Sequence, residues 1–186
     1  MLPLAAEDKK NLLRFARLSV ECAVTKQVMG TPAEMPDSLL QPAGAFVTLW
    51  ENGDLRGCVG HILAEQPLFM SVMESAKAAA LHDRRFNPVQ PSELPELGLE
   101  ISVLSALQEV LPDQVEAGKH GVMITRGRSR GLLLPQVAIE HGWSRETLLT
   151  ETCRKAGLPA EAWRQRVKIE VFTSEIFTDQ IEESNR

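Results

Sequence analysis

The chain has 186 residues, of which 44% are hydrophobic, and its formal net charge at pH 7 is -5. This length and composition are typical of one globular domain that buries its own hydrophobic core. The negative charge argues against bulk electrostatic binding to nucleic acid or to anionic membranes, and three cysteines, an odd number, exclude a complete disulfide framework.

The beginning of the chain lacks the features of a targeting signal. Glu7 and Asp8 stand where a signal peptide would carry Lys or Arg ahead of an apolar stretch. No window approaches the roughly 20 apolar residues of a membrane-spanning helix. We therefore expect a cytoplasmic protein that does not associate with membranes.

The first elements along the chain are a helix and a hairpin. Apolar residues recur at helical spacing over residues 5–29, and Gly30 is a typical residue to end that helix. Residues 45–50 are rich in strand-forming side chains, and the Asn52-Gly53 dipeptide that follows favours a tight turn. Residues 55–62 then form the returning strand of the predicted hairpin.

The remaining elements mix helices and strands without a repeating rhythm. They are a helix from Pro67 to about His82, a Pro-rich loop at 83–97 with one helical turn at 92–94, a strand at 97–104, a hairpin at 121–134, helices at 135–141 and 144–156, and a final strand at 167–173. This order favours an α+β fold, a mostly antiparallel sheet with packed helices, in which the Pro-rich loop separates two unequal lobes of one domain. Residues 180–186 are expected to form a frayed tail.

The segment LRGCVGH at residues 55–61 combines a cation, a thiol and an imidazole. Cys58 would be a nucleophilic thiolate there, which the charge of Arg56 would favour, and His61 would act as its base. Gly57 would allow a ligand to approach the strand backbone. The alternative is a small buried cysteine on a core strand, with His61 at the exposed end of that strand.

Strand geometry limits the functional interpretation. Side chains two residues apart share a face, so Arg56 and Cys58 lie together, whereas Cys58 and His61 are three apart and point to opposite faces. A Cys58–His61 dyad therefore requires a bulge at Val59 or Gly60.

Two further residues are candidates for substrate binding. Arg85 could hold a phosphate or carboxylate through two parallel hydrogen bonds. It could instead form an ion pair with Asp83 or Glu100 that fixes the Pro-rich loop. Gln136, at the start of a predicted helix, could present its amide to a ligand or satisfy backbone groups.

Other kinds of site have less support. The sequence contains neither a metal-ligand motif nor a nucleotide-binding motif, so we predict no metal site and no cofactor. Cys22 and Cys153 lie on predicted helices and are expected to pack in the core. Arg126, Arg128 and Arg130 alternate through a predicted turn, where solvated side chains are favoured over a phosphate site.

Four segments together resemble the AMMECR domain family. They are LRGCVG at 55–60, DRRFNP at 83–88, GLLLPQVA at 131–138 and KAGL at 155–158. The resemblance implies an α+β fold with two unequal lobes and a cleft near Cys58. Prokaryotic members are similar to system protein A of the AmmeMemoRadiSam set, so it also implies a Memo-like protein and a radical S-adenosylmethionine (radical SAM) protein as partners. The family brings no secure biochemical activity with it.

Three hypotheses for function follow. In the first, Cys58 performs acyl or group transfer on a small anionic substrate that Arg56 and Arg85 hold and Gln136 orients. In the second, the chain is a non-catalytic subunit that binds the Memo-like or radical SAM protein. The third, nucleic-acid binding through the arginines of the loop and the turn, is disfavoured by the net charge.

Overall fold

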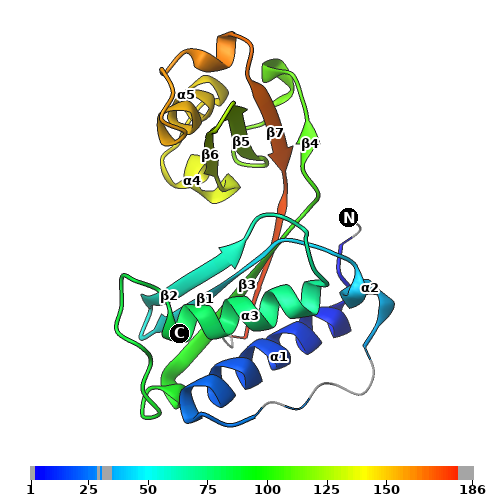
Figure 1. Cartoon of the computed structure of the whole chain (residues 1–186), viewed down its shortest axis with the longest axis vertical. Coiled ribbons are helices and arrows are strands. Elements are labelled where there is room, and N and C mark those ends of the chain that lie inside the picture. Colours follow the sequence, from blue (N-terminus) through cyan, green and yellow to red (C-terminus); the bar gives the residue numbers. More distant parts are fainter. Residues whose placement is uncertain (1–2, 29, 31–34, 180–186) are drawn as a thin grey trace, which may run out of the picture. The chain divides into compact units, whose positions relative to one another are not determined.

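The computed structural model describes residues 3–28, 30 and 35–179, and the chain divides into two compact units. Unit 1 comprises Met1–Leu104 and Glu175–Arg186, and unit 2 comprises Ser105–Ser174, so the Pro-rich loop at 83–97 lies inside unit 1 and does not separate the two units as predicted. Each unit combines helices with a four-stranded antiparallel sheet (Figure 1), which confirms the α+β class. The predicted tail at 180–186 lies outside the described residues.

Unit 1 contains a sheet with the strand order β2-β1-β3-β8, in which β2 is an edge strand. Its elements are α1 (Ala6–Thr25), α2 (Asp37–Leu40), β1 (Ala45–Glu51), β2 (Asp54–His61), α3 (Leu68–Leu81), the 3-10 turn η1 (Leu94–Glu96), β3 (Leu97–Leu104) and β8 (Ser174–Thr178). The predicted hairpin and the helix after Pro67 are confirmed, and the helical turn expected at 92–94 lies two residues later, at Leu94–Glu96.

The core of unit 1 lies between its sheet and the helices α1 and α3, which pack side by side (Figure 1). Val47 and Leu49 of β1 are fully buried there. Alternate residues of a strand point to opposite faces, so Phe46, Thr48 and Trp50 point away from the two helices. The opposite face of the sheet therefore carries a different set of side chains.

The first helix is shorter than predicted. It ends at Thr25 because Lys26 takes the left-handed conformation, with φ 58°, and the next N–H, that of Gln27, donates to the Cys22 carbonyl at 2.9 Å. The prediction relied on Gly30 as the terminating residue. A lysine in this conformation is uncommon, so sequence pattern alone pointed further along the chain.

Unit 2 is built around a sheet with the order β4-β7-β5-β6. Its elements are β4 (Gln108–Glu109), the turn η2 (Pro112–Gln114), β5 (Gly121–Arg126), β6 (Ser129–Leu133), α4 (Pro135–Glu140), α5 (Arg145–Lys155), the turn η3 (Ala162–Arg164) and β7 (Lys168–Phe172). Ser144 caps α5 by accepting a hydrogen bond from the Thr147 N–H at 3.2 Å. Ile124, Leu148 and Leu149 are fully buried in a separate core.

Four elements were not predicted, namely α2, β4, η2 and β8. The short helix α2 lies in a region that we expected to be irregular, and β8 directly follows the strand that we expected to be the last. β8 pairs with β3, about 70 residues away in sequence, and such a pairing leaves no local signal. Within the described part of the chain, no helix is long and apolar enough to cross a membrane.

Candidate functional site

The β1–β2 hairpin contains a β-bulge at Arg56. Trp50 pairs with Leu55 as a two-residue turn requires. The next residue of β1, Leu49, pairs with Gly57, so Arg56 is an extra residue without a partner. Every residue of β2 beyond the bulge is therefore shifted by one position, which exchanges the two faces of the strand.

The shift turns Cys58 away from the helices. Cys58 pairs with Thr48, whereas without the bulge it would pair with Val47 in the core. Gly57 takes the position that faces α3, where a Cβ atom would lie only 2.3 Å from the Ala79 carbonyl oxygen. Gly57 therefore allows α3 to pack closely against the strand, whereas from the sequence it was expected to allow the approach of a ligand. A residue with a Cβ atom does not fit at this position.

We call the sheet face opposite α1 and α3 the Cys58 face. Its side chains from β1, β2 and β3 are Phe46, Thr48, Trp50, Leu55, Cys58, Glu100, Ser102 and Leu104. Thr48 pairs with Cys58 on one side and with Glu100 on the other, so the three form a row across three strands. The Thr48 hydroxyl donates to Cys58 Sγ at 3.3 Å, and Cys58 is partly exposed. Burial raises the pKa of Glu100.

The loop after α3 holds the backbone of Cys58 at the sheet edge. The Cys58 N–H donates to Asp83 Oδ2 at 2.8 Å, and Arg85 Nη2 donates to the Cys58 carbonyl at 3.3 Å. Arg85 also binds Asp83 through Nε at 3.0 Å and Nη2 at 2.7 Å, which is one of the two ion pairs considered from the sequence. This hydrogen-bonded pair keeps the pKa of Asp83 well below its usual range. The Arg85 side chain remains 55% exposed.

Arg56 is engaged in holding the Pro-rich loop. Its Nε and Nη2 donate to the two carboxylate oxygens of Glu93 at 2.7 and 3.2 Å, and Nη1 donates to the Asn87 carbonyl at 3.0 Å. The pair with Glu93 raises the pKa of Arg56 and lowers that of Glu93. Only 13% of the Arg56 side chain is exposed. The predicted role in substrate binding therefore has no support from the geometry.

His61 does not meet Cys58. Pairing with β1 is regular from Gly57 to His61, so the bulge that the dyad needs at Val59 or Gly60 is missing from this strand. Cys58 and His61 consequently project from opposite faces of the sheet. His61 is exposed at the end of β2.

Comparison with known proteins identifies the family of this chain. The AMMECR1 family model matches residues 13–177. The chain belongs to the AMMECR1 family. It is 37% identical to a protein from Methanothermobacter thermautotrophicus, covering 94% of this chain and 96% of that protein, and 41% identical to protein TK0174 from Thermococcus kodakarensis, covering 91% and 89%. The crystal structure of the uncharacterized protein PH0010 from Pyrococcus horikoshii matches with a TM-score of 0.84 and 35% identity, covering 95% of this chain and 94% of that one.

The segments that carry the AMMECR1 resemblance have clear structural roles in this chain. In the segment at 55–60, Arg56 forms an ion pair with Glu93 of the Pro-rich loop, and Gly57 allows α3 to pack closely against β2. In the second segment Asp83 and Arg85 bind the backbone of Cys58. The two segments therefore form one connected structure, and that structure fixes where the Cys58 thiol lies.

Gln136 of this AMMECR1 chain belongs to unit 2, in the first turn of α4. Its Oε1 is buried and accepts no hydrogen bond from the residues that the structure describes. A buried acceptor left unpaired costs about 1–3 kcal/mol. The amide oxygen therefore satisfies no backbone group among the described residues, and a role of Gln136 in binding stays a prediction.

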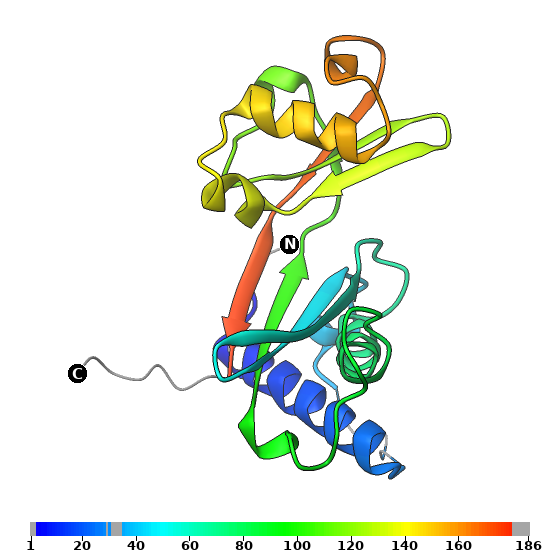
Figure 2. The same ribbon diagram turned by 90° about the vertical axis from the view of Figure 1, so that its left-hand side faces the viewer.

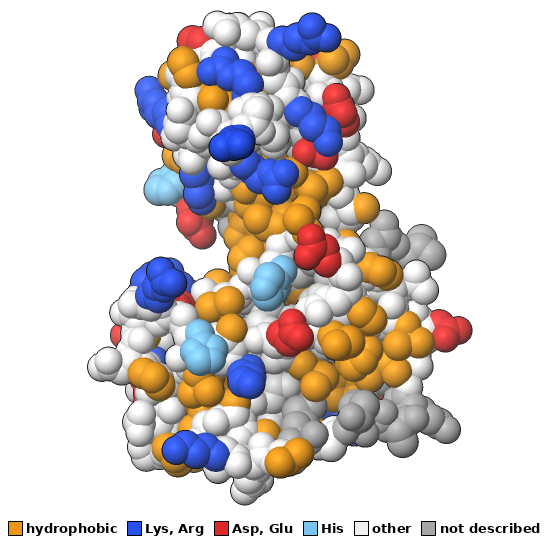
Figure 3. All heavy atoms as spheres, in the orientation of Figure 1, with side chains coloured by type: hydrophobic (Ala, Val, Ile, Leu, Met, Phe, Trp, Pro, Cys, Tyr) orange, Lys and Arg blue, Asp and Glu red, His pale blue; other side chains and the backbone are white. Residues whose placement is uncertain are grey.

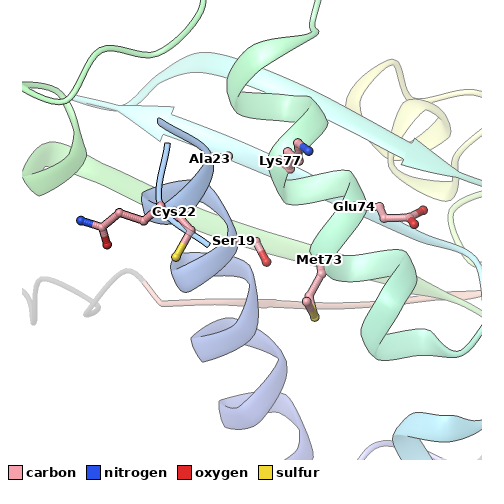
Figure 4. A pocket seen from close by; sticks show the side chains of 7 residues that line it. Ser19, Cys22, Ala23, Met73, Glu74 and Lys77 are labelled. Atoms are coloured by element: carbon pink, nitrogen blue, oxygen red, sulfur yellow. The ribbon is translucent and has the colours of Figure 1, made fainter. Parts of the chain in front are cut away.

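The other two cysteines differ from each other. Cys153 is fully buried as predicted, and burial raises its pKa. Cys22 is instead partly exposed and lines a groove of about 250 Å³ between α1 and α3, opposite Met73 and Lys77 (Figure 4). Among the described residues, no group of three or more His, Cys, Asp or Glu side chains is arranged to hold a metal ion.

Two residues of the candidate site were missed in the sequence analysis. Thr48 was treated only as part of a strand. In a hairpin without a bulge, Cys58 would pair with Val47, so Thr48 was not expected beside the thiol. Glu100 was considered only as an ion-pair partner of Arg85. Its place beside Thr48 depends on the pairing of β1 with β3, which no local pattern indicates.

Proposed function

We propose that Cys58 is a nucleophile that accepts an acyl group, or a similar group, from an activated donor bound on the Cys58 face. The observation that supports this best is the hydrogen bond from the Thr48 hydroxyl to the sulfur of Cys58, a partly exposed residue. A donated hydrogen bond favours the thiolate, which is the reactive form of cysteine. The exposed part of the Arg85 guanidinium, close to the Cys58 carbonyl, suits an anionic group on the donor.

The proposed step is an ordinary acyl transfer. The Cys58 thiolate, whose proton has passed to solvent, attacks the carbonyl carbon, a carbon–sulfur bond forms, and the bond to the leaving group breaks. The leaving group then takes up a proton. Glu100 is suited to supply it because burial raises its pKa and it lies in the same row of the sheet.

An activated ester tests the proposal without knowledge of the natural donor. The chain is treated with p-nitrophenyl acetate, and acetylated residues are located by peptide mass mapping. We expect one acetyl group on Cys58, lost in Cys58→Ser and retained in Cys22→Ser, which removes the other partly exposed thiol. Equal acetylation of Cys22 and Cys58 would contradict the proposal. Thr48→Val, which keeps the thiol, covers the case in which Cys58→Ser folds poorly and should slow the acetylation.

A second candidate is a non-catalytic role as a partner subunit. It is favoured by the finding that Arg56 and Arg85 both hold the loop in place, while His61 points away from Cys58. The Cys58 face would then bind the Memo-like or radical SAM protein. Co-purification distinguishes the candidates: a complex that survives Cys58→Ser but is lost in Trp50→Ala supports this role, and the absence of any complex with either protein contradicts it.

A further inference from the structure

Charge is divided unevenly between the two units. Residues 105–174 contain ten Lys and Arg against eight Asp and Glu, whereas the rest of the chain contains ten against seventeen. The net charge is therefore -7 for unit 1 and +2 for unit 2, which add up to the -5 of the whole chain. An argument from net charge against polyanion binding does not apply to unit 2 by itself.

Half of the cations in unit 2 are not neutralised by a partner. Lys119, Arg145, Arg154, Arg164 and Lys168 each form an ion pair with a glutamate. Within the described part of the chain, the other five form none, and they are Arg126, Arg128, Arg130, Lys155 and Arg166. All of these except Arg126, which is partly buried, are exposed.

The five free cations gather at one end of unit 2. Thr125 of β5 pairs with Arg130 on one side and with Lys168, two residues after Arg166, on the other. Gly131 of β6 lies so close to α5 that a Cβ there would be 2.4 Å from the Ala156 nitrogen, which brings the end of α5 to the same place. Figure 2 shows the β5–β6 turn, the last turn of α5 and the start of β7 together at this end.

We call this surface, formed by Arg126, Arg128, Arg130, Lys155 and Arg166, the basic end. Burial raises the pKa of Cys153 near the end of α5, and the charge of Arg126 opposes that rise, which places Arg126 near α5 as well. Figure 3 shows more Lys and Arg than acidic side chains on the face of unit 2 that it presents. The basic end is therefore a local concentration of positive charge.

We propose that the basic end binds the phosphate backbone of nucleic acid. Guanidinium groups hold phosphate oxygens through paired hydrogen bonds, and four of the five cations are arginines. A protein partner would need apolar or aromatic anchors. The exposed large hydrophobic residues described in unit 2 are Leu111 and Ile139, and neither lies on the elements of the basic end. Phosphate contacts need only the cations.

Fluorescence anisotropy of a labelled single-stranded DNA oligonucleotide tests the proposal on the full chain. The test variant is Arg128→Gln, Arg130→Gln, Arg166→Gln, and the matched control is Arg14→Gln, Lys119→Gln, Arg145→Gln. Both remove three positive charges, so the net charge is equal in the two. We expect the affinity to fall at least tenfold in the test variant and less than twofold in the control. With about four phosphate contacts, the wild-type affinity should fall about 50-fold when salt rises fourfold.

Three results would overturn the proposal. They are no binding by the wild-type chain at low salt, an equal loss of affinity in the two triple variants, and binding to anionic phospholipid vesicles in preference to the oligonucleotide. Circular dichroism of both variants checks that the fold is unchanged. Cys58→Ser should bind the oligonucleotide as the wild type does, because the basic end does not depend on the thiol.

Discussion

The Thr48 hydroxyl and the Cys58 sulfur lie 3.3 Å apart because Arg56 is a bulged residue. Strand side chains alternate between the two faces of a sheet, so a shift of one position would bury Cys58 beneath α3 and break this contact. The bulge therefore bears on whether Cys58 is a core residue or an accessible thiol. It favours the accessible thiol.

Replacing Thr48 by Val should make Cys58 less reactive. The substitution removes the only hydroxyl donor that the described residues offer to the sulfur. A hydrogen bond of this kind contributes about 1 kcal/mol, which corresponds to a roughly fivefold slower reaction with iodoacetamide near neutral pH. Peptide mapping gives the rate at Cys58 relative to Cys22 in the same sample. An unchanged ratio would show that Thr48 does not activate the thiol.

Replacing Gly57 by Ala should destabilise unit 1. The added Cβ would lie 2.3 Å from a backbone oxygen of α3, so the strand or the helix must move. Overpacking of this kind typically costs about 1–3 kcal/mol. Gly30→Ala is the matched control because a Cβ there meets no atom within 4 Å. Urea denaturation compares the two, and equal stabilities would mean that β2 tolerates the displacement.

Replacing Asp83 by Asn should lower the free energy of unfolding by about 2 kcal/mol at pH 7, since a hydrogen-bonded charge is lost. The Asp83–Arg85 hydrogen bonds depress the pKa of Asp83 in the folded chain. The unfolded state therefore binds more protons as the pH falls below about 4, and the stabilisation by Asp83 is lost there. The difference between variant and wild type should be constant between about pH 5 and 7 and shrink below pH 4.

Denaturation at each pH measures this difference for Asp83→Asn, with the exposed Asp54→Asn as its control. A gap that persists undiminished at pH 3 would mean that the carboxylate charge is not what holds Cys58.

Replacing Glu100 by Gln should separate stability from activity. Burial raises the pKa of Glu100, so the folded chain retains this proton to higher pH than the unfolded chain does. Stability then falls as the pH rises from about 4.3 through the folded pKa. The variant should be at least as stable as the wild type at pH 7 and equal to it near pH 4.

Acetyl transfer from trifluoroethyl acetate, whose alkoxide needs a proton to leave, should nevertheless fall in Glu100→Gln, by about 100-fold if Glu100 donates that proton. The exposed Glu96→Gln serves as the control. A loss of stability at pH 7 with unchanged acetylation would assign Glu100 a purely structural role.

Sequence patterns predicted the elements of this site better than their relationships. The Asn52-Gly53 turn is a local signal, and both residues do adopt positive φ angles of 51° and 84°. The bulge, in contrast, goes with the close packing of Gly57 against Ala79 of α3, a contact that no local sequence pattern indicates.

The same distinction applies to the charged residues. Arg85 and Asp83 are two residues apart, so their ion pair was among the alternatives considered from the sequence. Arg56 and Glu93 are 37 residues apart, and a free Arg56 was the natural assumption. The resemblance to the AMMECR family correctly singled out these segments, but only the fold showed that Arg56, Asp83 and Arg85 hold the loop and the strand together.

The insertion of unit 2 between β3 and β8 has a consequence for synthesis on the ribosome. Close to the two ends of unit 2, the Ser105 N–H donates to the Thr173 carbonyl and the Thr173 N–H donates to Ser105 Oγ, both at 2.9 Å, so these ends lie side by side. β8 emerges only after all of unit 2 has been translated. Until β8 has been synthesised, the sheet of unit 1 therefore has only three strands, and the outer edge of β3 has no strand paired to it.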